Sequence, residues 1–199
     1  MSDVKTITNL QAETVKQWHE REIDNHYHGF LNLVCCQHQQ NFRLWHEEDI
    51  ARSPDVADAE LAAVKRRIDK LNQRRNDLIE QLDDALITQL RQSEVAPQPS
   101  APLNTETPGS VIDRLSILSL RIFHMREQAD REDADEEHRQ KAEARLEILH
   151  QQLGDLSNSL SELLADVFAG RKRLKVYRQM KMYNDATMNP YLYKARKTA

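Results

Sequence analysis

The chain has 199 residues, of which 39% are hydrophobic, 30% are charged and only four are glycine. The length suits one sizeable domain, and leucine, alanine, glutamine, glutamate and arginine outweigh the strand-forming residues, which argues against a β-sandwich, a β-barrel or a doubly wound sheet. The net charge is −4 and no apolar run approaches 18 residues, so we expect no membrane span; residues 1–10 lack the apolar segment of a signal peptide.

Apolar residues recur every three or four positions along most of the chain, which predicts an all-α fold, an up-and-down helical bundle of about five helices in a single domain. The first helix is expected to begin with a capping box at Thr8 and Gln11 and to break at residues 25–29. A second helix is predicted for residues 30–52 and a third for residues 58–92, the latter on the order of 50 Å long at about 1.5 Å per residue.

Residues 93–106 hold three prolines and no periodic apolar face, which is typical of a linker or a mobile loop. The fourth helix is expected to begin at residues 107–110, with Pro108 in its first turn. A turn near residues 133–135 separates it from a fifth helix that Gly170 ends.

The C-terminal tail differs in charge from the rest of the chain. Residues 171–199 contain nine lysines and arginines against one acid, a local charge of +8 that leaves −12 for residues 1–170. An acidic body with a basic tail favours self-association, an acidic partner or an anionic ligand. Basic residues interleaved with tyrosines can bind nucleic acid, but the acidic body would repel a polyanion. We therefore expect a structured tail that packs onto the bundle, and no nucleic-acid binding.

Polar side chains occupy positions where the helical pattern calls for hydrophobic ones. They are His38, Asp49 and Arg52 on the second predicted helix, Arg75 on the third with Asp69, Asn72 and Asn76 beside it, and Asp113, Arg114 and His124 on the fourth. Polar groups inside a bundle cost stability unless they are paired, and departures from local rules concentrate at functional sites. Two interpretations stay open: a functional site between the helices, or a buried polar network that fixes their register.

The start of the fourth predicted helix has the features of an anion site. Free N–H groups at a helix N-terminus attract anions, Gly109 lets a ligand approach the backbone, and Arg114 one turn later is placed to clamp a phosphate. The alternative is an ordinary helix start, in which Ser110 is the cap and Asp113 favours the positive end of the helix dipole.

Metal binding has less support from the sequence. His46 with Asp49, and His124 with Glu127, are spaced so that each pair shares one helix face. The matching glutamates of a four-helix di-iron site are missing, however. We assign no metal ligand and no cofactor from the sequence.

The two adjacent cysteines, Cys35 and Cys36, form no disulfide framework, and such cysteine usage fits a reducing cytoplasm. Both fall on or beside the apolar stripe of a helix, where a thiol behaves as a small hydrophobic group. No serine-nucleophile elbow, P-loop or dinucleotide fingerprint is present. The tripeptide Trp-His-Glu occurs at 18–20 and again at 45–47, but three residues are too few to establish a repeat.

Three stretches together resemble a bacterial family called domain of unknown function 4254. They are residues 41–52 (NFRLWHEEDIAR), 107–118 (TPGSVIDRLSIL) and 181–190 (KMYNDATMNP), with IDKLNQRRND at 68–77 between them. The resemblance implies a cytoplasmic, helical bacterial protein with no established activity, whose genes often lie beside glycosyltransferases of surface-polysaccharide assembly. It places in the family motifs Asn41, Trp45, His46, Glu48, Asp49, Arg52, Asp69, Asn72, Asn76, Asp77, Thr107, Gly109, Ser110, Asp113 and Arg114.

These features lead us to predict a protein that binds a phosphate-bearing small molecule, a nucleotide or a sugar nucleotide, in a polar cleft. The backbone of Gly109 and Ser110, with the side chains of Arg114 and Arg75, would hold the anion. The remaining predicted ligand contacts are Arg52, Asp69, Asn72, Asn76 and Asp113.

Three side chains are the predicted acid–base or sugar-hydroxyl contacts: His46, Glu48 and Asp49. His46 is the best candidate for proton transfer because the ordinary pKa of histidine lies near neutrality. Two other functions stay open. One is a non-catalytic adaptor or homo-oligomeric scaffold, a homodimer for example, assembled through the long helices; the other is a metal-dependent enzyme.

Overall fold

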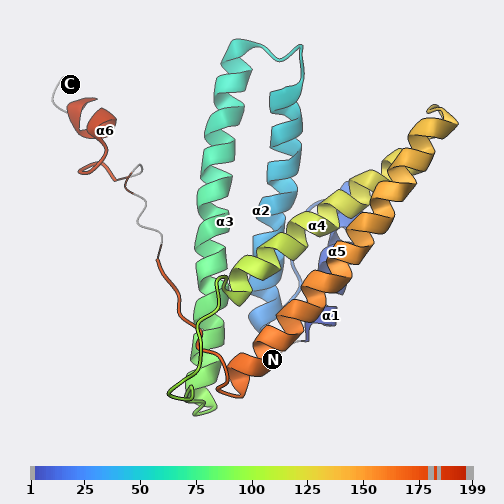
Figure 1. Ribbon diagram of the computed structural model, residues 1–199. Helices are drawn as coiled ribbons and strands as arrows, with labels where there is room; N and C mark the ends of the chain where they lie inside the picture. The colour runs from blue at the N-terminus through green and yellow to red at the C-terminus, as the bar shows by residue number, and fades with distance from the viewer. Residues whose placement is uncertain (1–2, 179–181, 183–184, 196–199) are drawn as a thin grey trace.

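The computed structural model describes residues 3–178, 182 and 185–195 (Figure 1). Part of the motif at 181–190 and the last basic residues lie outside this range. The all-α prediction is confirmed, since the described residues form helices and no β-strand. The helices are α1 (Val4–Glu20), α2 (Gly29–Arg52), α3 (Asp58–Gln92), α4 (Pro108–Ala129), α5 (Glu136–Phe168) and α6 (Pro190–Ala195). None of these helices is both long enough and apolar enough to cross a bilayer.

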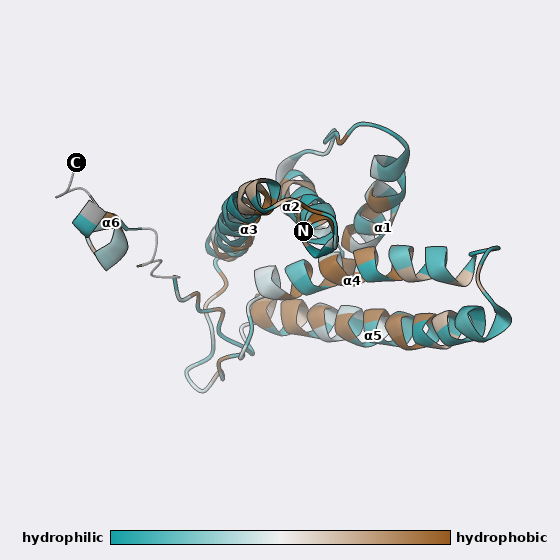
Figure 2. Cartoon of the chain, turned by 90° about the horizontal axis from the view of Figure 1, so that it is seen from above, coloured by the Kyte–Doolittle hydropathy of each residue, from teal (hydrophilic) through white to brown (hydrophobic). Residues whose placement is uncertain are grey.

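Two long helical hairpins cross one another. Helices α2 and α3 form the first hairpin, and α4 and α5 form the second (Figure 1). In the view from above, α2 and α3 are seen nearly end-on, whereas α4 and α5 lie lengthwise (Figure 2). Helix α1 packs against α4. The crossing therefore brings α1, α2, α3 and α4 together at one place.

The main hydrophobic core lies at this crossing and draws side chains from the first five helices. Its buried members are Val4, Ile7, Leu10, Val15, Trp18, Val34, Cys35, Phe42, Leu82, Leu86, Val111, Ile112, Leu115, Leu120, Leu160 and Leu164. Each fully buried large aliphatic or aromatic side chain stabilises the fold by about 1.5–3 kcal/mol relative to its exposed state. A smaller cluster of Leu44, Val64 and Ile68 joins α2 to α3.

Helix α1 begins earlier than its sequence suggested. The carboxylate of Asp3 accepts a hydrogen bond from the Thr6 N–H at 2.6 Å, so the helix starts at Val4. The expected capping box at Thr8 and Gln11 is therefore wrong. Thr8 lies inside the helix, where its hydroxyl donates to a carbonyl one turn earlier, and Gln11 is buried. An aspartate is a strong N-cap, and Asp3 precedes the first buried residue of the stripe.

The other helix boundaries follow the predicted signals. Helices α2 and α3 cover the predicted ranges to within one residue. The side chain of Thr107 accepts from the Ser110 N–H at 3.3 Å and caps α4, with Pro108 as its first residue. Asp135 caps α5 in the same way. Gly170 ends α5 with a φ of +70°, a conformation that residues with a Cβ rarely adopt.

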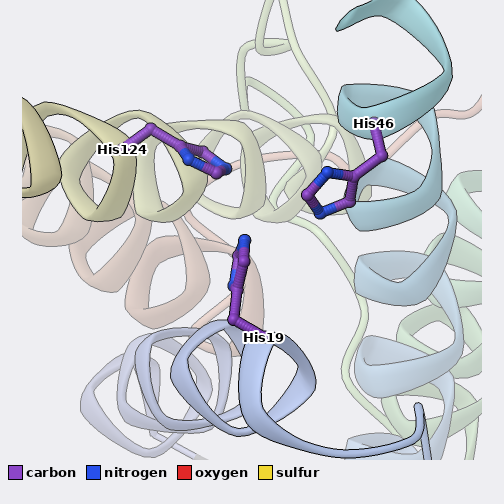
Figure 3. Close-up of side chains that lie close together, drawn as sticks. All are labelled: His19, His46 and His124. Atoms are coloured by element: carbon purple, nitrogen blue, oxygen red, sulfur yellow. The ribbon is translucent and has the colours of Figure 1, made fainter. Parts of the chain in front are cut away.

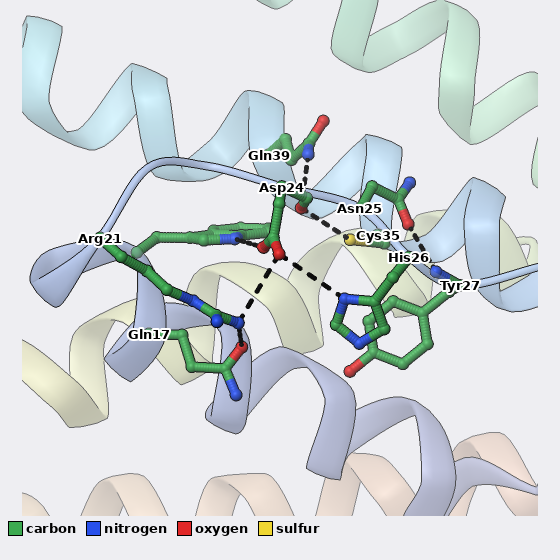
Figure 4. Close-up of polar contacts among 9 residues, drawn as sticks. Gln17, Arg21, Asp24, Asn25, His26, Tyr27, Cys35 and Gln39 are labelled. Carbon is green, nitrogen blue, oxygen red and sulfur yellow. Dashed lines mark hydrogen bonds and ion pairs between the residues drawn. The ribbon is translucent and has the colours of Figure 1, made fainter.

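The loop between α1 and α2 is tied down by Asp24 (Figure 4). Its carboxylate accepts a hydrogen bond from the Trp18 indole N–H at 3.3 Å and lies 3.6 Å from the Arg21 guanidinium. Its backbone carbonyl accepts from the Gln39 side chain at 3.0 Å. The loop thereby connects the end of α1 to the middle of α2, which fixes how the two helices face one another.

The proline-containing segment 93–107 lies against the residues that follow α5. The Gln98 N–H donates to the Gly170 carbonyl at 2.9 Å, and the Arg173 side chain donates to the Ala101 carbonyl at 2.7 Å. Farther along, Arg178 forms ion pairs with two carboxylates of α3. The predicted contact of the tail with the bundle holds for these residues, whereas α6 lies apart from helices α1–α5 (Figure 1).

Helix α4 begins in direct contact with α3. The Gly109 N–H donates to the Asp83 carboxylate at 2.7 Å. A Cβ atom at position 109 would lie 2.6 Å from the Ile79 carbonyl oxygen and 2.9 Å from the Asp83 carboxyl carbon. Real side chains do not approach so closely, so the contact between the two helices requires glycine here.

This contact predicts opposite effects for two glycine substitutions. Gly109→Ala should lower the free energy of unfolding by about 1–3 kcal/mol, because the added methyl group overpacks the interface. Gly154→Ala in α5 is the matched control. A Cβ there meets nothing within 4 Å, so the better helix former should add about 0.5–1 kcal/mol. Urea unfolding followed by circular dichroism measures both. A Gly109→Ala protein as stable as Gly154→Ala would contradict the close contact.

Candidate functional site

A cleft of about 390 Å³ opens where α2, α3 and α4 meet. It brings together side chains that the sequence analysis had placed in one site. The lining residues are Asn41, Leu44, Trp45, Glu48, Asp49 and Arg52 from α2, Asn72 and Arg75 from α3, and Ile117, Leu120 and Arg121 from α4. The predicted site residues in this set are Glu48, Asp49, Arg52, Asn72 and Arg75. These residues are far apart in the sequence but lie close in space, because the α2–α3 hairpin packs both helices against α4.

Beneath the cleft, the buried carboxylate of Asp113 holds groups from two other helices. It accepts hydrogen bonds from the side-chain amides of Gln37 at 2.6 Å and Asn41 at 2.9 Å. The Nε atom of Arg75 lies 3.7 Å from the same carboxylate oxygen. Burial raises the pKa of Asp113, while the charge of Arg75 and the two amide hydrogen bonds oppose the rise. Asp113 thus positions Asn41 and Arg75 at the cleft wall.

Arg52, Arg75 and Arg121 give the cleft positive groups from three helices. Arg52 is paired with Glu48 at 2.9 Å, both on α2. Arg75 faces Asp113, but its Nε–H is buried without a hydrogen-bond acceptor. Arg121 is exposed, and no hydrogen bond or ion pair joins it to the described part of the chain. The cleft therefore combines a free guanidinium with two that are held by carboxylates.

A second set of buried polar groups lies behind Asn41. The Asn41 amide donates to the Ser116 hydroxyl oxygen at 2.8 Å, and that oxygen lies 2.6 Å from Nδ1 of His38. Desolvation lowers the pKa of the His38 imidazole to about 3, against a weaker opposing effect of the Gln11 backbone. His38 is therefore neutral in the folded protein, and these groups join α2 to α4.

The other predicted ligand contacts lie outside the cleft. Asp69 is exposed and pairs with a lysine one turn earlier, and Asn76 is half-buried on α3. At the start of α4, the Gly109 N–H is taken by Asp83 and the Ser110 N–H by the cap residue of the helix. Arg114 pairs with Glu106 at 2.8 Å. A carboxylate of the protein thus stands where a ligand anion was expected.

His46 also lies outside the cleft, on another face of α2, where it meets His19 of α1 and His124 of α4. One ring nitrogen of each lies within 4.8 Å of those of the other two, and the three rings point toward one another (Figure 3). Burial lowers the pKa of His46, and the nearby His19 and His124 lower it further, against the opposing charges of Asp49 and Glu127.

Among the arginines and histidines of these sites, Arg121 and His19 were not predicted as site residues from the sequence. Arg121 carries no pattern that separates it from other arginines on α4. His19 had a weak signal, because Trp18-His19-Glu20 repeats the tripeptide that contains His46. In the structure the His19 and His46 rings lie with their centroids 5.2 Å apart. The repeated tripeptide therefore marks two histidines that meet.

The buried His38 predicts a pH dependence of stability. Its pKa falls from 6.5 to about 3 on folding, so below pH 6.5 the unfolded chain binds a proton that the folded chain does not. The stability that this group contributes is complete above pH 6.5. It is lost as the pH falls, at up to about 1.4 kcal/mol per pH unit until about pH 3.

His38→Asn removes this titration, so the stability difference between wild type and variant should narrow as the pH falls from 7 to 4.5. Urea unfolding of both proteins across this range measures the difference, and the carboxylates that titrate in both proteins cancel. His150→Asn is the control, since His150 is exposed on α5. Parallel stability curves for wild type and His38→Asn would contradict the assignment of a neutral, buried imidazole.

Comparison with known proteins identifies the family. Residues 31–176 match the model of the family described as "Protein of unknown function (DUF4254)". No curated protein and no solved structure matches the chain. The matched range includes every residue that lines the cleft, as well as His46 and His124, whereas His19 precedes it. Since the match spans well over half of the sequence, the chain belongs to the DUF4254 family.

Proposed function

We propose that the protein binds a phosphate-bearing small molecule, a nucleotide or a sugar nucleotide, in the cleft between α2, α3 and α4. The observation that carries the proposal is the convergence of Arg52, Arg75 and Arg121, one from each helix, on a single cleft. Its volume of about 390 Å³ falls in the range of small-molecule sites, which is roughly 300–1,000 Å³.

The arginines supply the groups that recognise a phosphate. A guanidinium presents its N–H donors in a planar fork that matches two phosphate oxygens. Arg121 has no carboxylate partner in the described part of the chain, so its charge is available to a ligand. Arg75 is 27% exposed and is fixed from below by Asp113. An anchored and a free arginine on facing walls can hold one phosphate between them.

The remaining lining groups suit a sugar or a base. The carboxylates of Glu48 and Asp49 accept hydrogen bonds from hydroxyl groups, and the Asn72 amide can both donate and accept. The Trp45 ring offers an apolar wall, and its stacking on His124, at 4.6 Å between centroids and 9° between planes, fixes its orientation. Sugar nucleotides are of particular interest because the family resemblance implies genes that lie beside glycosyltransferases of surface-polysaccharide assembly.

The start of α4 is not part of the proposed site. Its Gly109 N–H already binds a carboxylate, and Arg114 is held by Glu106 at the outer surface. Arg121, two turns farther along α4, takes the role that the sequence had suggested for Arg114. His46 is likewise absent from the cleft, so we propose binding and assign no proton transfer there.

A thermal-shift panel of nucleotides and sugar nucleotides tests this function. A ligand present at a hundredfold excess over its dissociation constant stabilises the folded state by about 2.7 kcal/mol. Arg121→Ala should weaken binding roughly 10- to 150-fold, since a hydrogen bond to a charged group contributes about 1.5–3 kcal/mol. Because Arg121 is exposed, this substitution should leave the melting temperature of the free protein unchanged.

Arg114→Ala is the matched control, with the same change of charge two turns away on α4. It should bind the ligand as the wild type does. Loss of binding in Arg114→Ala with retention in Arg121→Ala would move the site from the cleft to the first turns of α4. If no compound in the panel shifts the melting temperature, the proposal fails and the adaptor function becomes the better explanation of the long helices.

A further inference from the structure

Three histidines from three different helices form a cluster at the crossing of the hairpins. His19 stands near the end of α1, His46 in the second half of α2 and His124 in the second half of α4 (Figure 3). One ring nitrogen of each lies within 4.8 Å of those of the other two. Imidazole nitrogens around a tetrahedral zinc ion are separated by about 3.3 Å, given Zn–N bonds of about 2.0–2.1 Å. Movements of about 1 Å or less therefore bring all three to one ion.

Hydrogen bonds at Nδ1 orient two of the three rings. Nδ1 of His19 lies 2.7 Å from the Val15 carbonyl oxygen, an acceptor, so Nδ1 carries the proton and Nε2 keeps its lone pair. Nδ1 of His124 lies 2.7 Å from the Glu127 carboxylate, which fixes the same tautomer. In metal sites, a histidine ligand almost always donates its other N–H to a carboxylate or a backbone carbonyl in this way.

The Nε2 atom of His124 has no protein partner. It is buried, and no hydrogen bond reaches it from the described residues. A buried nitrogen lone pair without a donor costs free energy. The neighbouring His19 and His46 rings do not relieve this cost, because the structure gives only ring contacts between them and His124. A cation bound among the three rings would satisfy this atom.

Aromatic side chains hold the three imidazoles in place. Phe123 stacks on His19 at 4.2 Å between ring centroids, and Trp45 stacks on His124 at 4.6 Å. Phe42 makes T-shaped ring contacts with both His19 and His46. An apolar shell limits the access of water and strengthens the interaction of an ion with its ligands. His19 is exposed, so the cluster is open toward solvent on one side.

From these contacts we propose that His19, His46 and His124 bind one divalent transition-metal ion, with zinc the preferred metal. Neutral imidazole is a ligand of choice for zinc, and three histidines with a fourth position open to water or a small anion form the typical donor set of a catalytic zinc site. The three metal ligands are not among the residues that line the proposed ligand cleft, and the site stands on another face of α2.

Metal titration of the full-length protein, purified without a histidine tag and freed of metal by a chelator, tests the proposal. Calorimetry with Zn²⁺ should give one ion per chain. Co²⁺ should produce the visible d–d absorption of a four- or five-coordinate site. Glu127→Gln should weaken binding by about 10- to 100-fold as a positioning residue, and His124→Gln by more than that. Absence of stoichiometric binding in the wild type overturns the proposal.

Matched variants keep the test decisive. His19→Gln changes an exposed side chain and so keeps the fold; it should weaken Zn²⁺ binding roughly 100-fold or more, beyond the range expected for an outer-shell partner. His150→Gln, on the exposed face of α5, should leave binding unchanged. Binding retained in folded His19→Gln, or lost in His150→Gln, refutes the site. Arg121→Ala should leave Zn²⁺ binding intact, which separates a failure of this site from a failure of the ligand cleft.

Discussion

The carboxylate of Asp113 is the group on which the arrangement of the helices depends. A buried carboxylate costs several kcal/mol unless hydrogen bonds and an opposite charge surround it. Here the compensating groups come from other helices, with Gln37 and Asn41 from α2 and Arg75 from α3. An arrangement that separated α2 or α3 from α4 would leave the charge without partners. The cost of burying this carboxylate therefore favours a packing of the two hairpins in which Asp113 contacts its partners on α2 and α3.

The histidine cluster depends on the same packing. His46 belongs to α2 and His124 to α4, so the hydrogen bonds that fix α2 on α4 also fix the distance between these rings. The neutral His38 contributes to this through Ser116, which it meets at 2.6 Å. Burial lowers the pKa of His38 to about 3, so the ring that meets Ser116 is neutral above that pH. A polar interior of this kind specifies register as well as stability.

Local signals account for the features that the sequence predicted. Gly170 marks a helix end, Thr107 and Pro108 mark a helix start, and each of these effects operates within a few residues. The placement of polar residues on apolar stripes likewise identified Arg75 and Asp113 before their contact was known. The apolar stripe of an amphipathic helix forms its buried face, so polar residues on that stripe are expected to lie in the interior.

Features that depend on the crossing of the hairpins could not be predicted from the sequence. The Gly109 N–H donates a hydrogen bond to Asp83, 26 residues earlier in the chain. No local sequence pattern predicts that hydrogen bond. Arg114 and Arg121 lie two turns apart on one face of α4, and both reach the groove toward α5. The point at which α4 crosses the first hairpin decides which of them lines the same cleft as Arg75. The crossing point depends on side-chain packing over the whole interface, so it cannot be predicted from any one segment of the sequence.

Trp45 connects the two proposed sites physically. Its ring forms part of the cleft wall and at the same time stacks on His124. A ligand that reorients the indole must alter the environment of His124, and an ion that holds His124 must in turn restrict the indole. Coupling between two binding equilibria is reciprocal by thermodynamic necessity. If an ion at His124 changes the affinity of the cleft for its ligand, the ligand therefore changes the affinity for the ion by the same factor. Trp45 is thus the side chain through which binding at one proposed site would change the affinity of the other.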